Sequence, residues 1–125
     1  MRISGTVQPG KRIGRTLGFP TANIAPDAPE ALPRENGVYV ARLTLADGRT
    51  VPCVLNKGRH PTLPEGAASV EAHLFDFDEN LYGQRVEVEF LCFLRPERRF
   101  DNPAQLADQI ACDAARARAW LRENP

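Results

Sequence analysis

The chain has 125 residues, of which 42% are hydrophobic and 26% are charged, as is typical of one soluble globular domain with its own core. Lys and Arg total 16, and Asp and Glu also total 16, so the formal net charge is zero and the composition gives no broad basic surface for nucleic acid. There is no basic and apolar leader and no long apolar run, so the sequence indicates neither secretion nor membrane spanning.

The three cysteines, Cys53, Cys92 and Cys112, are odd in number, widely spaced and without a CxxC pair. This pattern argues against a disulfide framework or a zinc site and favours a reducing, cytoplasmic setting. We expect each cysteine to be a small buried hydrophobic residue rather than a nucleophile.

The first half of the chain reads as short strands separated by loops. Residues 2–7 form a strand, and a proline-rich, irregular connection occupies residues 25–35. Residues 37–45 alternate as a clear strand. The Asp-Gly turn at 46–49 returns the chain into a partner strand at 50–56, so these two segments predict a hairpin.

The second half continues this pattern up to the last strand. Residues 57–66 form a Gly- and Pro-rich loop, residues 69–77 a strand and residues 76–83 an acidic connection. Residues 85–94 give the strongest strand signal, with an apolar second half that indicates cover on both sides. Its predicted apolar face consists of Val86, Val88, Phe90, Cys92 and Leu94.

The last element is a helix, which we predict to begin after an N-cap at Asn102, with Pro103 as its first residue and Gln105 at the third position. Its apolar stripe consists of Leu106, Ile110, Ala114, Ala117 and Leu121. Short strands followed by one helix indicate an antiparallel sheet. The pattern alone leaves two arrangements open, a small closed barrel without exposed edges or an open sheet with the helix on one face.

The stretch from Gly14 to Ile24, GRTLGFPTANI, carries the first functional signal. Glycines let backbone N–H groups approach a ligand closely, and Pro20 fixes the backbone ahead of Thr21 and Asn23. These two residues are spaced i, i+2 and point the same way in an extended chain. Two neutral oxygens beside a glycine-rich basic loop suit a phosphate-bound Mg²⁺. The alternative is an ordinary surface loop that leads into a strand.

Charged residues in and beside the later strands give the second signal. Glu71 shares a strand face with His73, and it is either a solvated glutamate or a general base toward a hydroxyl. We interpret His73 as a packing or supporting residue rather than a metal ligand. The basic segment 94–100 is either a solvated connection or a place where an arginine and an aromatic ring stack on a planar ligand.

Six blocks occur in order and together resemble riboflavin kinase, and more specifically the kinase module of bacterial bifunctional riboflavin kinase/FAD synthetases. The resemblance covers nearly the whole chain, and Pro-Thr-Ala-Asn is its specific motif. The blocks are GRTLGFPTANI (14–24), GVY (37–39), NKGRHPT (56–62), VEAHL (70–74), LYG (81–83) and FLRPERRF (93–100).

The resemblance implies an all-β fold, a six-stranded antiparallel Greek-key barrel with a C-terminal helix packed outside, over a single domain of residues 1–125. It implies an enzyme that converts ATP and riboflavin into ADP and FMN. Thr21 and Asn23 would hold Mg²⁺ with the ATP phosphates, and Glu71 would take the proton of the ribityl 5′-hydroxyl. The other implied contacts are Gly10, Arg15, Leu74, Asp76 and Tyr82 for the nucleotide, and Arg95, Arg98 and Phe100 for the flavin.

Two residues depart from the family pattern, since the family usually has an aliphatic residue where Lys57 stands and phenylalanine where Leu63 stands. This altered loop motivates one alternative, a flavin- or nucleotide-binding barrel without turnover. A purely structural barrel bound to a partner protein is the other. We expect no nucleotidyltransferase domain ahead of the module, and hence no FAD synthesis. We also expect a monomer that binds riboflavin, FMN, ATP and ADP but neither nucleic acid nor membrane.

Overall fold

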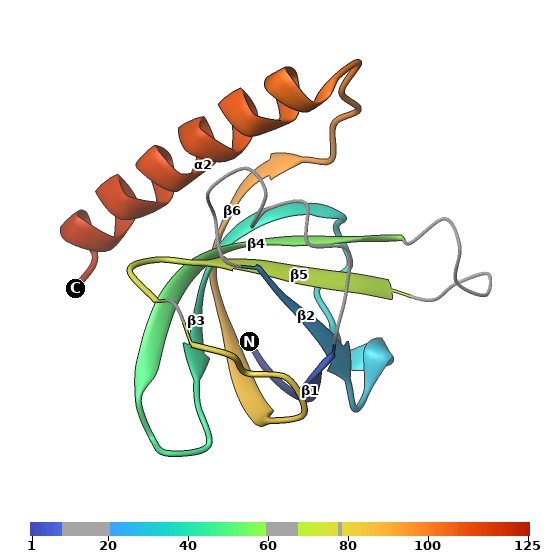
Figure 1. Cartoon of the computed structure of the whole chain (residues 1–125), viewed down its shortest axis with the longest axis vertical. Helices are drawn as coiled ribbons and strands as arrows, with labels where there is room; N and C mark the ends of the chain where they lie inside the picture. Colours follow the sequence, from blue (N-terminus) through green and yellow to red (C-terminus); the bar gives the residue numbers. More distant parts are fainter. Residues whose placement is uncertain (9–20, 60–67, 78) are drawn as a thin grey trace.

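The computed structural model describes residues 1–8, 21–59, 68–77 and 79–125, which form a closed barrel of six strands with a long helix against its outside (Figure 1). The elements are β1 (Arg2–Gln8), β2 (Thr21–Pro26), the short 3-10 helix η1 (Pro29–Ala31), β3 (Gly37–Thr44), β4 (Thr50–Arg59), β5 (Ala68–Leu74), β6 (Arg85–Pro96) and α2 (Pro103–Glu123). The strand order is β1-β2-β5-β4-β3-β6, and every neighbouring pair is antiparallel. The predicted Greek-key barrel is confirmed, and the open sheet is excluded.

The barrel interior is filled by apolar side chains that alternate along the strands. On β3, Tyr39, Ala41 and Leu43 point inward, and the Tyr39 ring packs edge-on against Phe90 and Phe93, with ring centroids 5.3 and 5.1 Å apart. Fully buried interior residues from the other strands include Val7, Leu55, Val70, Ala72 and Val88. The hairpin of β3 and β4 is confirmed.

A second apolar cluster lies between the outer face of the barrel and α2. It contains Val38 and Val40, which alternate with the inward residues of β3, so this strand is covered on both sides. The helix contributes Ala114 and Ala117, whose small side chains allow it to lie close to the sheet. Val54 of β4 and Phe75, just after β5, complete the buried part of the cluster.

The start of α2 is as predicted. The Asn102 side chain accepts a hydrogen bond from the Gln105 backbone N–H at 2.9 Å. The Gln105 side chain accepts one from the Asp101 N–H at 3.1 Å, one residue earlier than in a standard capping box. Pro103 is the first helical residue. This capped end of the helix comes directly after the segment that leaves β6.

The alternation predicted for residues 85–94 is wrong beyond Phe90. Val86, Val88 and Phe90 belong to the interior, but Cys92 and Leu94 pack in the cluster beneath α2. The reason is two β-bulges, because the pairing of β6 with β3 is interrupted twice by an extra residue on β6.

The extra residues are Leu91 and Leu94, which have no paired residue on β3. Each bulge reverses the side to which the following side chain points. After both bulges, Arg95 lies opposite Val38 on the outer face, beneath the helix. Because two reversals cancel, Arg95 keeps the outward side that simple alternation gives it, and the bulges change only the register, so that Arg95 rather than Phe93 lies opposite Val38.

Smaller differences occur at strand ends and cysteines. Ala25 and Pro26, predicted to begin an irregular connection, continue β2, and β5 ends at Leu74. All three cysteines are free thiols. Cys53 is buried as expected, and burial raises the pKa of its thiol, whereas Cys112 is exposed, contrary to prediction. Among the described residues, no helix combines the length and apolar character needed to cross a membrane.

Candidate active site

Two rows of side chains cross the outer face of the barrel, because residues paired across antiparallel strands point to the same side. From β2 to β6, the first row consists of Asn23, Glu71, Asn56, Val38 and Arg95. The second row consists of Thr21, His73, Val54, Val40 and Cys92. Residues from distant blocks of the sequence, among them Thr21, Asn23 and Glu71, therefore become neighbours.

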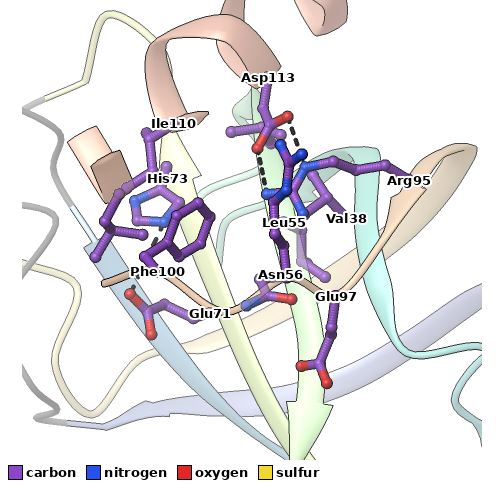
Figure 2. Close-up of a pocket in the computed structure, with 13 residues that line it drawn as sticks. Val38, Leu55, Asn56, Glu71, His73, Arg95, Glu97, Phe100, Ile110 and Asp113 are labelled. Atoms are coloured by element: carbon purple, nitrogen blue, oxygen red, sulfur yellow. Dashed lines mark hydrogen bonds and ion pairs between the residues drawn. The ribbon is translucent and has the colours of Figure 1, made fainter. Parts of the chain in front are cut away.

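The middle of these rows forms one wall of a cavity of about 250 Å³ between the barrel and the first half of α2 (Figure 2). This wall consists of Val38, Val54, Leu55, Asn56, Glu71 and His73. The facing wall consists of Glu97, Arg98 and Phe100 from the segment after β6, and Leu106 and Ile110 from α2. Arg95 and Asp113 complete the lining. The cavity thus combines apolar walls with a few polar groups, which is typical of a small-molecule site.

The buried histidine of the barrel wall lies beside the glutamate. His73 is 8% exposed, and its Nε2 lies 3.8 Å from Glu71 Oε1, whereas its Nδ1 lies 3.5 Å from Thr21 Oγ1. Burial lowers the pKa of His73 to about 4, against a smaller opposite effect of the Asp113 charge. The imidazole is therefore neutral at neutral pH. The Glu71 side chain is 28% exposed, so its carboxylate can reach a ligand in the cavity.

A bidentate ion pair connects β6 to the helix. Arg95 Nε and Nη2 donate to the two carboxylate oxygens of Asp113 at 2.9 and 2.8 Å, and the two side chains are only 16% and 3% exposed. Gln109 Nε2 donates to Asp113 Oδ1 at 2.9 Å, and Arg98 Nη1 donates to Gln109 Oε1 at 2.6 Å. Arg95 therefore lines the cavity while the helix holds its guanidinium, and the chain of contacts ties the segment after β6 to α2.

The structure brings six of the predicted site residues together, and it separates others from them. Thr21, Asn23 and Glu71 share the outer face of the barrel with Arg95, while Arg98 and Phe100 line the cavity with Glu71. By contrast, the Leu74 side chain packs in the barrel interior. Asp76 is exposed and forms an ion pair of 3.3 Å with Arg118, in the second half of α2. Tyr82 packs against the barrel core.

Several expectations concern residues outside the part described. Gly10 and Arg15, predicted to contact the nucleotide, and Leu63, which departs from the family pattern, all lie there. The other departure, Lys57, is described and donates from Nζ to Asn36 Oδ1 at 2.6 Å. Lys57 is not among the residues that line the cavity, whereas its neighbour Asn56 is.

Asn56, Glu97 and Asp113 also line the cavity but were not predicted from the sequence. A signal for Asp113 was present, because it lies three positions after Ile110 and four before Ala117, inside the apolar stripe of the helix. An acidic residue on a buried stripe needs a partner. Asn56 and Glu97 carried no such local signal.

The donor atoms of β2 suit a cation that is already bound to phosphate. Among the described residues, no group of three or more His, Cys, Asp or Glu side chains could hold a metal ion. Thr21 and Asn23 instead offer one hydroxyl and one amide oxygen, and both residues are half-buried on the outer face. Mg²⁺ prefers oxygen ligands and commonly takes only one or two from protein, with water and phosphate as the others. The two residues fit that arrangement.

Known proteins resemble this chain over nearly its whole length. The family model Flavokinase, described as riboflavin kinase, matches residues 1–121. A bifunctional riboflavin kinase/FMN adenylyltransferase of Haemophilus influenzae is 42% identical over 124 residues, which cover 96% of this chain and 38% of that protein. An RNA-binding riboflavin kinase of Bacillus subtilis is 41% identical over 112 residues, covering 89% of this chain and 47% of that protein.

A solved structure of a riboflavin kinase also has a similar fold. The crystal structure of riboflavin kinase from Trypanosoma brucei has a TM-score of 0.74 to this chain at 25% identity, covering 98% of this chain and 78% of that one. The chain spans less than half the length of the two curated relatives named above. Since the family model matches all but the last four residues, the chain belongs to the riboflavin kinase (flavokinase) family.

Proposed function

We propose that the chain is a riboflavin kinase that transfers the γ-phosphoryl group of ATP to the ribityl 5′-hydroxyl of riboflavin. One observation carries the proposal, the pairing of β2 with β5, in which Asn23 lies opposite Glu71 and Thr21 opposite His73. Through this pairing, the proposed metal ligands stand one strand away from the Glu71 carboxylate on the cavity wall. Membership of the family supports the choice of substrates.

We assign the flavin ring to the cavity beneath α2. An isoalloxazine ring has apolar faces and a polar edge, and the cavity offers matching groups. Val54, Phe100 and Ile110 supply apolar contact, and Phe100 can stack on the ring. Asn56 supplies a donor and an acceptor for the edge. Arg95 and Arg98, the other predicted flavin contacts, line the same cavity.

Glu71 is the proposed general base. It accepts the proton of the 5′-hydroxyl while that oxygen forms a bond to the γ-phosphorus. The bond from the γ-phosphorus to the bridging oxygen breaks, and ADP leaves with the electron pair. A carboxylate in this role contributes about 10²–10⁴ in rate. Phosphoryl transfer otherwise depends on positioning and charge neutralisation, so one base is sufficient.

Thr21 and Asn23 are the proposed protein ligands of the divalent metal. When bound, the metal neutralises charge on the ATP phosphates. The hydroxyl and amide oxygens orient the nucleotide relative to Glu71. Gly10, Arg15, Leu74, Asp76 and Tyr82 stay predicted nucleotide contacts. Mg²⁺ as the specific metal is part of this proposal.

The direct test is incubation of the protein with riboflavin and Mg-ATP, with FMN detected by chromatography and flavin binding measured separately by fluorescence quenching. We expect both binding and FMN. Binding without FMN would favour the alternative, a flavin-binding barrel without turnover, which the unusual Lys57 motivates. A folded protein that neither binds flavin nor forms FMN would overturn both and favour a structural barrel.

Asn23→Ala tests the metal ligands. We expect this variant to lose Mg-ATP use much more than flavin binding, because it removes a proposed ligand of the phosphate-bound metal. Thr44→Ala is the matched control, since Thr44 is also half-buried on the outer face but stands at the far end of β3. Wild-type activity in Asn23→Ala would contradict the assignment.

Other expectations stay predictions. They are a cytoplasmic setting, a monomeric state and the absence of nucleic-acid binding. The last of these needs direct measurement, because the relative from Bacillus subtilis is called RNA-binding.

A further inference from the structure

His73 lies between Thr21, a proposed ligand of the metal, and Glu71, the proposed general base. It lies directly opposite Thr21 of β2 and two residues after Glu71 on its own strand. Figure 2 shows its ring on the cavity wall, with a dashed line to the Glu71 carboxylate. A histidine at this point touches both the proposed metal-binding side and the proposed base.

Each ring nitrogen faces one of these groups. Nδ1 lies 3.5 Å from Thr21 Oγ1, at the outer limit of a hydrogen bond, and Nε2 lies 3.8 Å from Glu71 Oε1. Hydrogen bonds at catalytic sites are often long in the unliganded protein and shorten when substrates bind. A movement of less than about 1 Å would bring both contacts to ordinary hydrogen-bond length.

The chemistry of the neighbours determines which nitrogen carries the proton. A buried imidazole favours its neutral form, in which one nitrogen donates and the other accepts. An ionised carboxylate only accepts, so Nε2 must be the donor toward Glu71. Nδ1 is then the acceptor, and the Thr21 hydroxyl proton points toward the imidazole. The hydroxyl oxygen, rather than its proton, is thereby turned toward a cation.

We propose that His73 is a positioning residue that, as the neutral Nε2–H tautomer, orients the Glu71 carboxylate through Nε2 and the Thr21 hydroxyl through Nδ1. The inference rests on the proposed function, because it assumes the tasks of Glu71 and Thr21 given there. One side chain would then aim the base and would also hold a metal ligand in its binding orientation.

Two amide substitutions separate the two contacts. The side-chain amide of His73→Asn lies near the position of Nδ1, and that of His73→Gln reaches the position of Nε2. We expect His73→Gln to keep kcat within about threefold and to raise the KM for Mg-ATP about tenfold. We expect His73→Asn to keep that KM but to lose about tenfold to hundredfold in kcat, the usual cost of one hydrogen bond to a charged group.

A merely structural role gives a different result. Loss of packing would lower thermal stability and would move kcat and KM together in both amide variants, and that outcome would overturn the proposal. His73→Leu, which keeps volume and loses both contacts, should change both kinetic parameters. Wild-type kinetics in His73→Leu would equally overturn it.

The tautomer can be measured without catalysis. The ¹⁵N chemical shifts of the imidazole ring in the unliganded protein should report Nε2–H at neutral pH. The sequence has two histidines, so His60→Gln assigns the signals. An Nδ1–H tautomer would overturn the inference even if FMN is formed. Failure to form FMN with an Nε2–H ring would instead overturn the proposed function and leave the tautomer assignment standing.

Discussion

The two faces of the barrel wall differ in kind, although they alternate along the same strands. Among the described residues, the inner face is filled by a buried cluster of mainly apolar side chains, such as Leu43 and Leu55, both fully buried. The outer face beneath α2 is apolar where Val40 and Ala117 share one buried cluster, but toward the start of the helix it carries the polar rows and the cavity. Alternate residues of the same strands therefore form the core on one side and the binding site on the other.

This difference separates stability from function within single strands. On β5, Val70, Ala72 and Leu74 belong to the interior, while Glu71 and His73 between them face the cavity. A substitution at one residue should therefore change stability, and a substitution at the next should change activity. Single substitutions can test that separation, and we expect the largest effect at Glu71.

Glu71→Gln should lower the rate of FMN formation by about 10²–10⁴ and leave the melting temperature nearly unchanged, because it removes the proposed base without removing volume. Glu89→Gln is the matched control, since its side chain is 27% exposed against 28% for Glu71 and it also lies outside the barrel, but paired with Arg2 and Arg42. Steady-state kinetics and thermal unfolding measure both effects. An unchanged rate in Glu71→Gln would remove the base from the mechanism.

Leu43→Ala should lower stability and leave activity nearly unchanged, the opposite of Glu71→Gln. It empties a fully buried position of the interior and should cost about 2–5 kcal/mol in the free energy of unfolding. Leu121→Ala makes the same change at a half-buried position on α2, against the outer cluster, and should cost about 1 kcal/mol. Urea unfolding gives both values, and activity per folded molecule should stay near wild type. A larger loss for Leu121→Ala would contradict the assignment of stability to the interior.

The two faces were also not equally predictable from the sequence. Local alternation predicted the interior, because a strand with one face in a core shows period 2 within itself. The rows of the outer face depend on the pairing of β2 with β5, which joins Thr21 to His73 across 52 residues, and no local pattern reports such a register. The family resemblance supplied the functional residues instead.

Two further features were missed for physical reasons. Residues 90–94 are all apolar, so this stretch shows no alternation of apolar and polar residues. The bulges at Leu91 and Leu94 therefore could not be inferred from the sequence. Asp113 was visible as a charge on an apolar stripe, but its partner was not, because the two bulges shift the register of β6 so that Arg95 rather than Phe93 lies opposite Val38 beneath the helix. The ion pair therefore could not be predicted from either residue alone.

Asp113→Asn tests that ion pair, which belongs to the outer face but is buried. Removing one charge leaves the Arg95 guanidinium without its counter-charge, and breaking a buried pair typically costs about 3–5 kcal/mol. We expect about 2 kcal/mol, because Arg95 retains some exposure and asparagine can still accept one hydrogen bond. Flavin affinity should also fall, since both residues line the cavity.

The control for this variant is Asp108→Asn, which neutralises an exposed aspartate on the same helix. Its stability should change by less than about 0.5 kcal/mol. Urea unfolding and fluorescence titration with riboflavin give the two quantities. Equal effects for both aspartates would mean that the ion pair contributes no more than a surface charge.

Asn102→Ala should give the smallest effect and the most local one. Loss of the N-cap typically costs about 1 kcal/mol, and the first turn of α2 is the part that carries Leu106 over the cavity. If flavin binding must reorder that turn, riboflavin affinity should fall about fivefold, which is the same energy expressed in Kd. Asn124→Ala removes a hydrogen bond to the Trp120 carbonyl at the other end of the helix, far along α2 from the cavity, and should leave affinity unchanged. Equal loss of affinity in both variants would show that the cavity responds to the helix as a whole rather than to its first turn.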